Sequence, residues 1–202
     1  MERIAGIILA AGESARMGED KALLPWGTTT FLGHLLRQVK DSPVGLVRVV
    51  LGANAETVQK RIPLGTAEVV VNRDWQKGQL SSLQAALDSL PRGMVEAALV
   101  CLVDHPCITS SVIRQLIDNF LESEKLIVLP TYRGRRGHPV IFSAKLFDEL
   151  RRAPLAVGAR AVVRAHRNDI LEVATDEEGV ILNVNDKDAY DKIQRRAPTE
   201  RA

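Results

Sequence analysis

The sequence predicts an α/β fold: a single Rossmann-like three-layer α/β/α domain with a mostly parallel sheet. Hydrophobic runs rich in β-branched residues alternate along the chain with segments of helical periodicity. Several of these runs are apolar at every position, which is typical of strands covered on both faces. The chain has 202 residues, 46% of them hydrophobic and 26% charged, which suits one such domain with a sizeable core.

In the first part of the chain, four hydrophobic runs bounded by turn residues predict strands. They comprise 4–9, 46–51, 67–71 and 97–103. Four segments with apolar residues three and four positions apart predict helices. They comprise 30–40, 54–61, 81–90 and 109–122. In the last of these, Thr109 is a good N-cap, and the apolar stripe that follows it predicts a core-facing side.

After Pro130, at the end of an expected strand over 126–130, a basic glycine-containing loop interrupts the alternation. Further strands are then expected over 140–142, 170–174 and 179–182, and helices over 144–151, 158–165 and 187–195. We expect the domain to span 1–195 and 196–202 to form a flexible polar tail. A ligand is expected at the carboxyl ends of the strands.

Composition excludes several classes of partner. Lys+Arg 27 against Asp+Glu 25 leaves a net charge of +2, too balanced for a nucleic-acid or membrane surface. No apolar run approaches the roughly 18 residues that span a bilayer. The first strand follows the N-terminus directly and leaves no room for a signal peptide, and Cys101 and Cys107 form no C-x-x-C pair. We therefore expect a cytoplasmic protein with two reduced thiols, bound to neither nucleic acid nor membrane.

The most informative segment, 4–21, reads IAGIILAAGESARMGEDK. Its small residues let backbone N–H groups approach a ligand, and Arg16 and Lys21 add fixed positive charge, a combination that suits a polyphosphate. An ordinary strand-to-helix turn with solvated charges is the alternative. The residues expected to bind a nucleotide here are Leu9, Ala10, Ala11, Gly12, Ser14, Arg16 and Lys21.

The spacing within this loop excludes two familiar phosphate sites. A Walker A loop has four residues between its glycines and a lysine directly after the second, whereas five residues lie between Gly12 and Gly18 and Lys21 comes later. The dinucleotide fingerprint needs three closely spaced glycines, which are absent here. The loop belongs to neither a P-loop NTPase nor a standard NAD site.

Asp104 is a candidate metal ligand. It follows the apolar run 97–103 and precedes His105-Pro106, which places a carboxylate at a carboxyl strand end. Mg²⁺ binds one or two carboxylates together with substrate phosphates, so Asp104 could hold the metal against a bound nucleotide. A turn-initiating aspartate before proline is the alternative.

The pattern L-A-A-G-x-S-x-R-M-G-x-x-K over 9–21 resembles the opening of the nucleotidyltransferases that attach a nucleotide to the molybdenum cofactor, in the MobA-like NTP transferase superfamily. Its L-A-A-G form resembles the cytidylyltransferase branch, whereas the guanylyltransferase branch more often has L-A-G-G. The resemblance implies a nucleotidyltransferase fold and Mg²⁺ as cofactor. It also implies transfer of a nucleotidyl group from an NTP, CTP in this branch, to the phosphate of molybdopterin, with transient contact to a molybdoenzyme as a further possible partnership.

Two further segments resemble motifs of this family. Asp104-His105-Pro106 resembles its Asp-x-Pro motif, whose aspartate is the metal ligand. Segment 72–83 resembles a pattern that lines the base and ribose pocket, and helix capping by its serines is the alternative. The nucleotide-binding residues expected from it are Asn72, Gly78 and Ser82.

The acceptor side is expected in the last third of the chain. Segment 137–139 resembles a Gly-His-Pro signature of the cytidylyltransferase branch, and 158–160 resembles a Gly-Ala-Arg stretch near the acceptor. The implied acceptor-binding residues are Gly137, His138, Pro139 and Arg160. The arginines at 133, 135 and 136 could attract the acceptor's phosphate, with a solvated basic loop and glycine capping as alternatives.

The closing motif departs from the family pattern. Asn183 and Asn185 replace two aspartates, although an Asn-x-Asn form occurs in the guanylyl branch. An asparagine still offers a neutral carbonyl oxygen to Mg²⁺, so the expected metal ligands are Asp104 and Asn185. Asp186 could compensate for the lost charge, but its neighbouring position points it elsewhere.

Together these motifs predict a magnesium-dependent nucleotidyltransferase with Arg16, Lys21 and Asp104 as catalytic residues. The two cations would neutralise the triphosphate, and no protein nucleophile is needed. Three alternatives stay open: a guanylyl- or sugar-phosphate nucleotidyltransferase, a non-catalytic nucleotide- or cofactor-binding module, and a redox enzyme on a Rossmann-like sheet. The absent dinucleotide fingerprint argues against the last.

Overall fold

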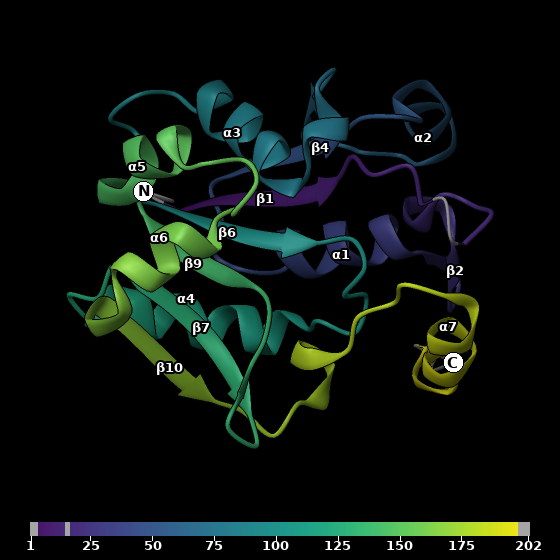
Figure 1. Ribbon diagram of the computed structural model, residues 1–202. Coiled ribbons are helices and arrows are strands. Elements are labelled where there is room, and N and C mark those ends of the chain that lie inside the picture. Colours follow the sequence, from purple (N-terminus) through teal and green to yellow (C-terminus); the bar gives the residue numbers. More distant parts are fainter. Residues whose placement is uncertain (1–3, 15–16, 198–202) are drawn as a thin grey trace.

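The computed structural model describes residues 4–14 and 17–197, and its centre is a single large sheet with the strand order β10-β7-β9-β6-β1-β4-β5 (Figure 1). A short strand, β8, pairs with β7 off this path. The strands of the sheet are β1 (Ile4–Ala10), β4 (Leu46–Leu51), β5 (Glu68–Val71), β6 (Ala97–Leu102), β7 (Ile127–Tyr132), β8 (Arg135–Arg136), β9 (Val140–Ser143) and β10 (Ile170–Ala174).

Most neighbouring strands run parallel. The pairs β1–β4, β1–β6, β4–β5 and β7–β10 are parallel, whereas β9 is antiparallel to both β6 and β7. The predicted mostly parallel α/β fold is therefore confirmed. Among the described residues, no helix combines the length and apolar character needed to cross a bilayer.

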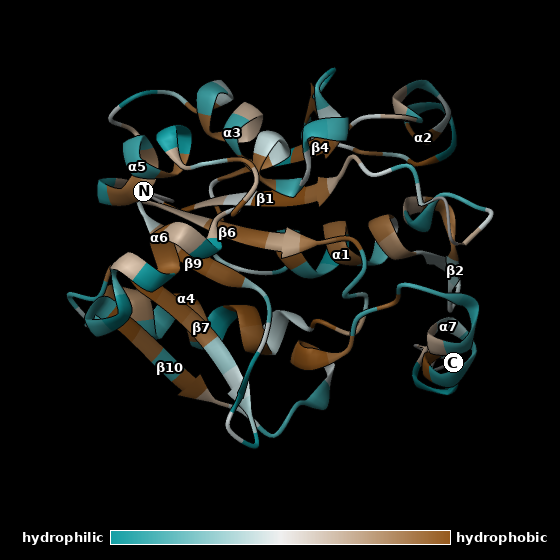
Figure 2. Ribbon diagram, viewed as in Figure 1, coloured by the Kyte–Doolittle hydropathy of each residue, from teal (hydrophilic) through white to brown (hydrophobic). Residues whose placement is uncertain are grey.

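Helices cover both faces of the sheet, and the alternation of side chains along β1 shows why the strand is apolar throughout. Ile4, Ile8 and Ala10 join the core shared with α1 and α4, while Ile7 and Leu9 join the core shared with α3 and α5. The central strands are accordingly hydrophobic along much of their length (Figure 2). The α-helices are α1 (Phe31–Lys40), α2 (Ala55–Arg61), α3 (Gln79–Ser89), α4 (Ser110–Glu122), α5 (Phe147–Arg152), α6 (Arg160–Ala165) and α7 (Lys187–Ile193).

One predicted strand is wrong. Residues 179–182 were expected to pair in the sheet, but Glu178–Ile181 forms a 3-10 helix, η5. The carbonyl oxygen of Val180 accepts a hydrogen bond from the backbone N–H of His138, at 2.8 Å, so this segment uses its backbone to hold a loop. A short apolar run does not distinguish these two outcomes.

Short elements escaped prediction. They are the hairpin of β2 (Pro25–Trp26) and β3 (Thr29–Thr30), the strand β8, and the 3-10 helices η1 (Lys21–Leu23), η2 (Trp75–Lys77) and η4 (Arg167–Asp169). The 3-10 helices η3 (Ala144–Leu146) and η6 (Gln194–Arg196) lie at the start and the end of the helices predicted over 144–151 and 187–195. Elements of two to four residues are too short to show a hydrophobic period. The expected tail begins inside η6, and 198–202 lie outside the described residues.

The C-terminal segment returns to the N-terminal part of the chain. The Tyr190 hydroxyl and the Gln194 side-chain amide both donate to the carbonyl oxygen of Pro25, at 3.1 and 3.0 Å. The Tyr190 ring lies 5.8 Å from that of Phe31, and α7 sits beside β2 (Figure 1). This packing brings the segment before α7 next to the loop that follows β1.

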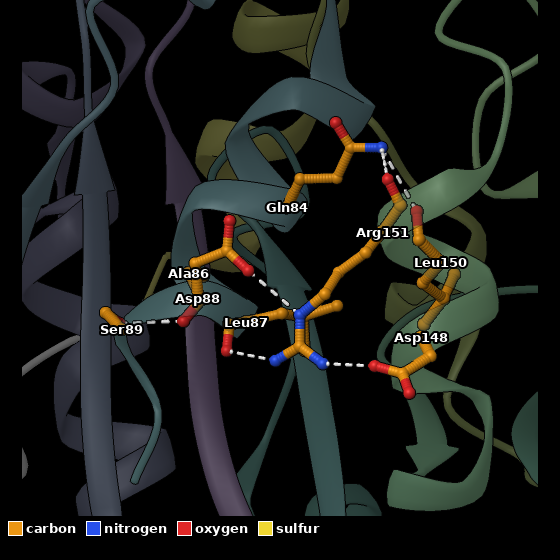
Figure 3. A network of polar contacts seen from close by, with 8 residues as sticks. All are labelled: Gln84, Ala86, Leu87, Asp88, Ser89, Asp148, Leu150 and Arg151. Atoms are coloured by element: carbon orange, nitrogen blue, oxygen red, sulfur yellow. Dashed lines mark hydrogen bonds and ion pairs between the residues drawn. The ribbon is translucent and has the colours of Figure 1, made fainter. Parts of the chain in front are cut away.

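A polar network joins α3 to α5, on the face of the sheet opposite to α1 and α4 (Figure 3). The Arg151 guanidinium donates to carboxylate oxygens of Asp88 and Asp148 and to the carbonyl oxygen of Leu87, at 2.8–2.9 Å. Gln84 donates to the last carbonyl groups of α5, at 3.0 and 3.1 Å. The network thereby ties α3 to α5, the helix that precedes α6 in the chain.

Candidate functional site

Two adjoining cavities open at the carboxyl edge of the sheet. The first, here called the loop cavity, measures about 440 Å³ and is bordered by the loop after β1 and by η2 and the start of α3. The second, the histidine cavity, measures about 610 Å³ and is bordered by His105, His138 and the segment before α6. Leu9, Leu102 and Asp104 line both cavities. Because β1 and β6 are parallel, with Leu9 opposite Leu102, their following loops leave the sheet together.

Most residues predicted to bind the nucleotide meet in the loop cavity. Those that line it are Leu9, Ala10, Ala11, Gly12, Ser14, Lys21, Gly78 and Ser82, together with Asp104 and Asn185. Asn72 does not line it, and Arg16 lies outside the described residues. Of the predicted acceptor residues, Gly137, His138 and Arg160 line the histidine cavity and Pro139 does not.

Side-chain hydrogen bonds fix the base of the loop after β1. The Ser14 hydroxyl accepts from the backbone N–H of Lys21, at 3.0 Å, and the Ser14 carbonyl accepts from that of Met17, at 2.8 Å. Asp20 caps η1 by accepting from the N–H of Ala22, at 2.8 Å, and also accepts from the Asn54 amide, at 2.9 Å. The backbone of Lys21 is therefore held in place while its long side chain projects into the cavity.

The Lys21 ammonium links the two predicted metal ligands. Its Nζ donates to Asn185 Oδ1 at 2.9 Å and lies 3.8 Å from Asp104 Oδ2. The Lys21 and Asp104 side chains are 15% and 24% exposed. Lys21 and Asn185 are 164 positions apart in the sequence. They are in contact because the C-terminal segment packs back across the strand ends.

Asp104 is held by its backbone and by its surroundings. Its carbonyl oxygen accepts from the N–H of Val184 at 2.8 Å, which joins the end of β6 to the C-terminal segment. Burial raises the pKa of the Asp104 carboxyl, and the positive charge of Lys21 is the largest influence in the opposite direction. The neighbouring Lys21 charge thus favours the ionised form of a partly buried carboxylate.

The donor atoms at this point fit a hard divalent cation. One carboxylate and one amide carbonyl oxygen are oxygen ligands of the kind that Mg²⁺ prefers. Within 4–14 and 17–197, no three His, Cys, Asp or Glu side chains cluster into a metal site, so most other ligands would come from phosphate and water. Asp186 does not add a ligand here, because its carboxylate accepts from the N–H of Ala189 and caps α7.

The Asn72 side chain supports the wall of the loop cavity through hydrogen bonds to the start of α3. Its side chain is buried, and its amide donates to the hydroxyl oxygens of Ser81 and Ser82, at 2.9 and 3.0 Å. Its Oδ1 accepts from the N–H of Asp74 at 2.9 Å. The prediction that Asn72 lies with the nucleotide-binding residues was close in sequence, but its side chain supports the wall and does not line it.

Ser81 and Ser82 differ although both accept from Asn72. Ser81 donates to the carbonyl oxygens of Gly78 and Asp74, at 2.7 and 3.0 Å, so its hydroxyl is used within the fold. Ser82 lies in the first turns of α3 and lines the loop cavity, and in the described part of the chain its hydroxyl donates no hydrogen bond. The Ser82 proton is thus available to a ligand acceptor.

The sequence reasoning missed several lining residues. Trp75, Gln76 and Gln79 border the loop cavity, and Asn183, Leu155 and Val157 border the histidine cavity. Trp75 matches a fixed position of the family motif that segment 72–83 resembles, Asn-x-x-Trp-x-x-Gly-x-x-x-Ser-Leu, so it could have been named. The glutamines had no such signal, because their position depends on the turn at Gly78, where a φ of 97° starts α3.

The basic hairpin β7–β8 contributes less charge to the histidine cavity than expected. Only Arg136 of its three arginines lines the cavity, and its guanidinium pairs with Glu172 at 2.6 Å. The Arg133 guanidinium lies 5.2 Å from the centre of the Tyr132 ring. Arg160, at the start of α6, is the predicted cation that does line this cavity.

The rings of His105 and His138 lie beside Asp104, with centres 4.7 Å apart and planes tilted by 55°. Burial lowers the pKa of each imidazole to about 4, so both are neutral at pH 7. Gly137 lies against the Val180 carbonyl, which leaves no space for a Cβ atom, and the His138 N–H donates to the same carbonyl oxygen at 2.8 Å. Neutral rings suit the binding role predicted for His138 rather than a charge-neutralising one.

This histidine pair predicts acid sensitivity. Because the folded pKa values of about 4 lie below the ordinary 6.5, the unfolded chain binds more protons between these limits. The free energy of unfolding should fall as the pH drops from 6.5 towards 4, by at most on the order of 3 kcal/mol per histidine. Urea unfolding at several pH values measures it. His105→Gln and His138→Gln together should flatten the dependence, apart from the part due to His34; an unchanged slope would contradict the assignment.

Comparisons with known proteins match this geometry. Residues 6–170 match the family of MobA-like NTP transferase domains. A protein of Mycobacterium marinum described as a probable molybdenum cofactor guanylyltransferase is 34% identical over 192 residues, covering 90% of this chain and 89% of the relative. A similar protein of Mycobacterium ulcerans is 32% identical over 191 residues, with the same coverage.

Solved structures agree with the family match. The crystal structure of Rv0371c from Mycobacterium tuberculosis H37Rv superimposes with a TM-score of 0.86 at 31% identity, covering 96% of this chain and 97% of that one. A structure of the same mycobacterial protein in complex with manganese has a TM-score of 0.82 at 30% identity, covering 96% and 98%. Both likenesses extend over nearly the whole chain.

Proposed function

The chain belongs to the family of MobA-like NTP transferase domains, and we propose that it transfers a guanylyl group from GTP to the phosphate of molybdopterin, releasing pyrophosphate. The general activity, nucleotidyl transfer of the MobA-like type, follows from family membership. One structural observation carries the proposal furthest: Asp104 lines both cavities. A carboxylate at that junction is suited to a reaction in which a phosphate from one side attacks a phosphate bound on the other.

In this proposal the loop cavity holds the nucleotide. Backbone N–H groups over 11–14 would surround the triphosphate, and Lys21 would neutralise oxygens of the α- and β-phosphates. Negative charge develops on the leaving pyrophosphate, so a fixed cation there stabilises the transition state more than the bound substrate. Positioning and charge neutralisation are sufficient, because phosphoryl transfer needs no protein nucleophile.

Asp104 and Asn185 would hold Mg²⁺, the divalent cation that their oxygen donors suit. When bound, the ion would supply charge neutralisation at the α-phosphate and the leaving oxygens. The histidine cavity would hold molybdopterin, with Arg160 near its phosphate and aliphatic side chains around its ring system. Asn183, a neutral amide on that side, adds no negative charge against an anionic acceptor.

The donor base is where the proposal departs from the sequence analysis, which favoured CTP. The relatives that match 90% of the chain at 32–34% identity are described as guanylyltransferases, and Asn183 and Asn185 agree with the Asn-x-Asn form of that branch. CTP stays the second candidate, because the L-A-A-G form over 9–12 and Gly-His-Pro over 137–139 favour it.

A competition experiment tests both donors and the acceptor. The protein, Mg²⁺ and molybdopterin are mixed with equimolar GTP, CTP, ATP and UTP, and the dinucleotide formed is identified by mass. We expect the guanine dinucleotide to predominate. Predominance of the cytosine dinucleotide would replace GTP by CTP. Binding of a nucleotide without any product under these conditions would favour the non-catalytic binding module.

Ser82 is expected to contribute to nucleotide affinity. Ser82→Ala removes a hydroxyl proton that faces the loop cavity, so the KM for the nucleotide should rise about tenfold with kcat little changed. Ser81→Ala is the matched control, because Ser81 accepts from the same Asn72 but donates inside the fold. It should lower stability and leave the KM within about twofold. Equal KM values for wild type and Ser82→Ala would remove Ser82 from the site.

A further inference from the structure

The position of the Lys21 ammonium has a consequence for the order in which ligands bind. Its Nζ lies 2.9 Å from Asn185 Oδ1 and 3.8 Å from Asp104 Oδ2, the two oxygens that fit a divalent cation. In this state one positive charge already lies between the carboxylate and the amide. A metal ion arriving alone would meet that charge at short range, in a site where the lysine side chain is only 15% exposed.

The ammonium can leave this position without a change of the backbone. The Lys21 N–H is fixed by the Ser14 hydroxyl, at 3.0 Å, whereas the charge sits on a flexible four-carbon stem. The same side chain lines the loop cavity together with Gly12 and Ser14. A triphosphate in that cavity would offer the ammonium several oxygens in place of Asn185 Oδ1 and Asp104 Oδ2.

We propose that Lys21 is a displaceable counter-ion that couples metal binding to nucleotide binding. In the free protein the ammonium neutralises Asp104 and competes with a divalent cation. When the nucleotide binds, the ammonium moves to the phosphates and releases Asp104 and Asn185 to the metal that accompanies them. Metal and nucleotide then strengthen each other's binding reciprocally. This inference rests on the proposed function, because it takes Asp104 and Asn185 as the metal ligands.

The test measures binding of Mn²⁺ alone, from the electron paramagnetic resonance signal of the free ion. Lys21→Met should bind Mn²⁺ about tenfold more tightly than the wild type, a typical size for coupling between sites. Lys21→Arg keeps the charge and should stay within about twofold of the wild type. Lys145→Met is the matched control: it removes an equal charge beyond β9, next to Ser143, which pairs with the start of β6 at the opposite edge of the sheet. It should also stay within about twofold.

The second part adds the α,β-methylene analogue of GTP. In the wild type the analogue should tighten Mn²⁺ binding at least fivefold, and in Lys21→Met this gain should shrink to about twofold. The double variant Lys21→Met with Asp104→Asn should lose the added affinity, which locates the ion at this site. If Lys21→Met does not fold, Lys21→Gln serves as the neutral variant, with the same expectation.

The outcomes separate this inference from the proposed function. A folded Lys21→Met that binds Mn²⁺ no more tightly than the wild type would overturn the counter-ion role and leave the metal site standing. Tight binding by Lys21→Arg as well would also overturn it, because charge would not be the cause. Failure of every variant to bind Mn²⁺, with or without the analogue, would overturn the proposed metal site itself.

Discussion

Asp104→Asn is expected to lower turnover at saturating nucleotide and acceptor by roughly 10³-fold. Within the described chain, Asp104 is the one carboxylate that borders both cavities, so its charge serves the bound nucleotide and the incoming acceptor at once. Asparagine has nearly the same shape. The hydrogen bond from the Val184 N–H to the carbonyl oxygen of residue 104 involves only the backbone and should survive.

The substitution should therefore separate chemistry from folding. Removal of a carboxylate whose pKa is raised by burial should leave the unfolding temperature unchanged or slightly higher at pH 7. Asp118→Asn, on the exposed side of α4, is the matched control with the same loss of charge and should keep full turnover. Steady-state pyrophosphate release measures the effect. Turnover within tenfold of the wild type in Asp104→Asn would remove Asp104 from the catalytic centre.

Lys21→Met is expected to lower turnover by about 10²- to 10³-fold, the second large effect. The methionine side chain has similar length and no charge, so charge developing on the leaving pyrophosphate would lose its fixed cation. Turnover should fall further than nucleotide affinity, because the cation is most effective in the transition state. The same variant should bind Mn²⁺ alone more tightly, so its higher Mn²⁺ affinity should accompany its lower turnover.

Lys21→Arg gives the matching control for this second effect. It keeps the charge but replaces a compact ammonium by a planar guanidinium, so turnover should fall by a smaller factor than in Lys21→Met. Single-turnover rates with pre-bound nucleotide separate the chemical step from binding. Equal single-turnover rates in Lys21→Met and the wild type would show that Lys21 acts on neither the leaving group nor the α-phosphate.

The strands and longer helices could be predicted because hydrophobic burial imposes a period on the sequence. In β1, residues of one parity face α1 and α4 and those of the other face α3, so an uninterrupted apolar run correctly indicated a strand covered twice. The predicted N-cap of α4 is confirmed, since the Thr109 hydroxyl accepts from the N–H of Val112. These features could be predicted because each depends only on neighbouring residues or on the regular spacing of apolar residues along one element.

The parts that escaped prediction depend on contacts between separate elements of the fold. Residues 178–181 form a 3-10 helix whose Val180 carbonyl accepts from the His138 N–H, and the Asn72 amide donates to both serines of α3 and does not line the cavity. The meeting of Asn185 with Lys21 requires α7 to pack against Pro25. Each contact joins elements whose proximity no local pattern encodes.

The central claim, that this chain joins a nucleotide to an acceptor phosphate through its α-phosphate, is tested most directly by label transfer. The protein is incubated with Mg²⁺, molybdopterin and GTP labelled with ³²P at the α-position, parallel reactions use CTP, ATP and UTP with the same label, and both products are quantified. We predict that label appears in a molybdopterin dinucleotide with one pyrophosphate released for each label transferred, and that Asp104→Asn lowers both rates roughly 10³-fold. Pyrophosphate released without labelled dinucleotide, or no product from any of the four NTPs, would contradict the account.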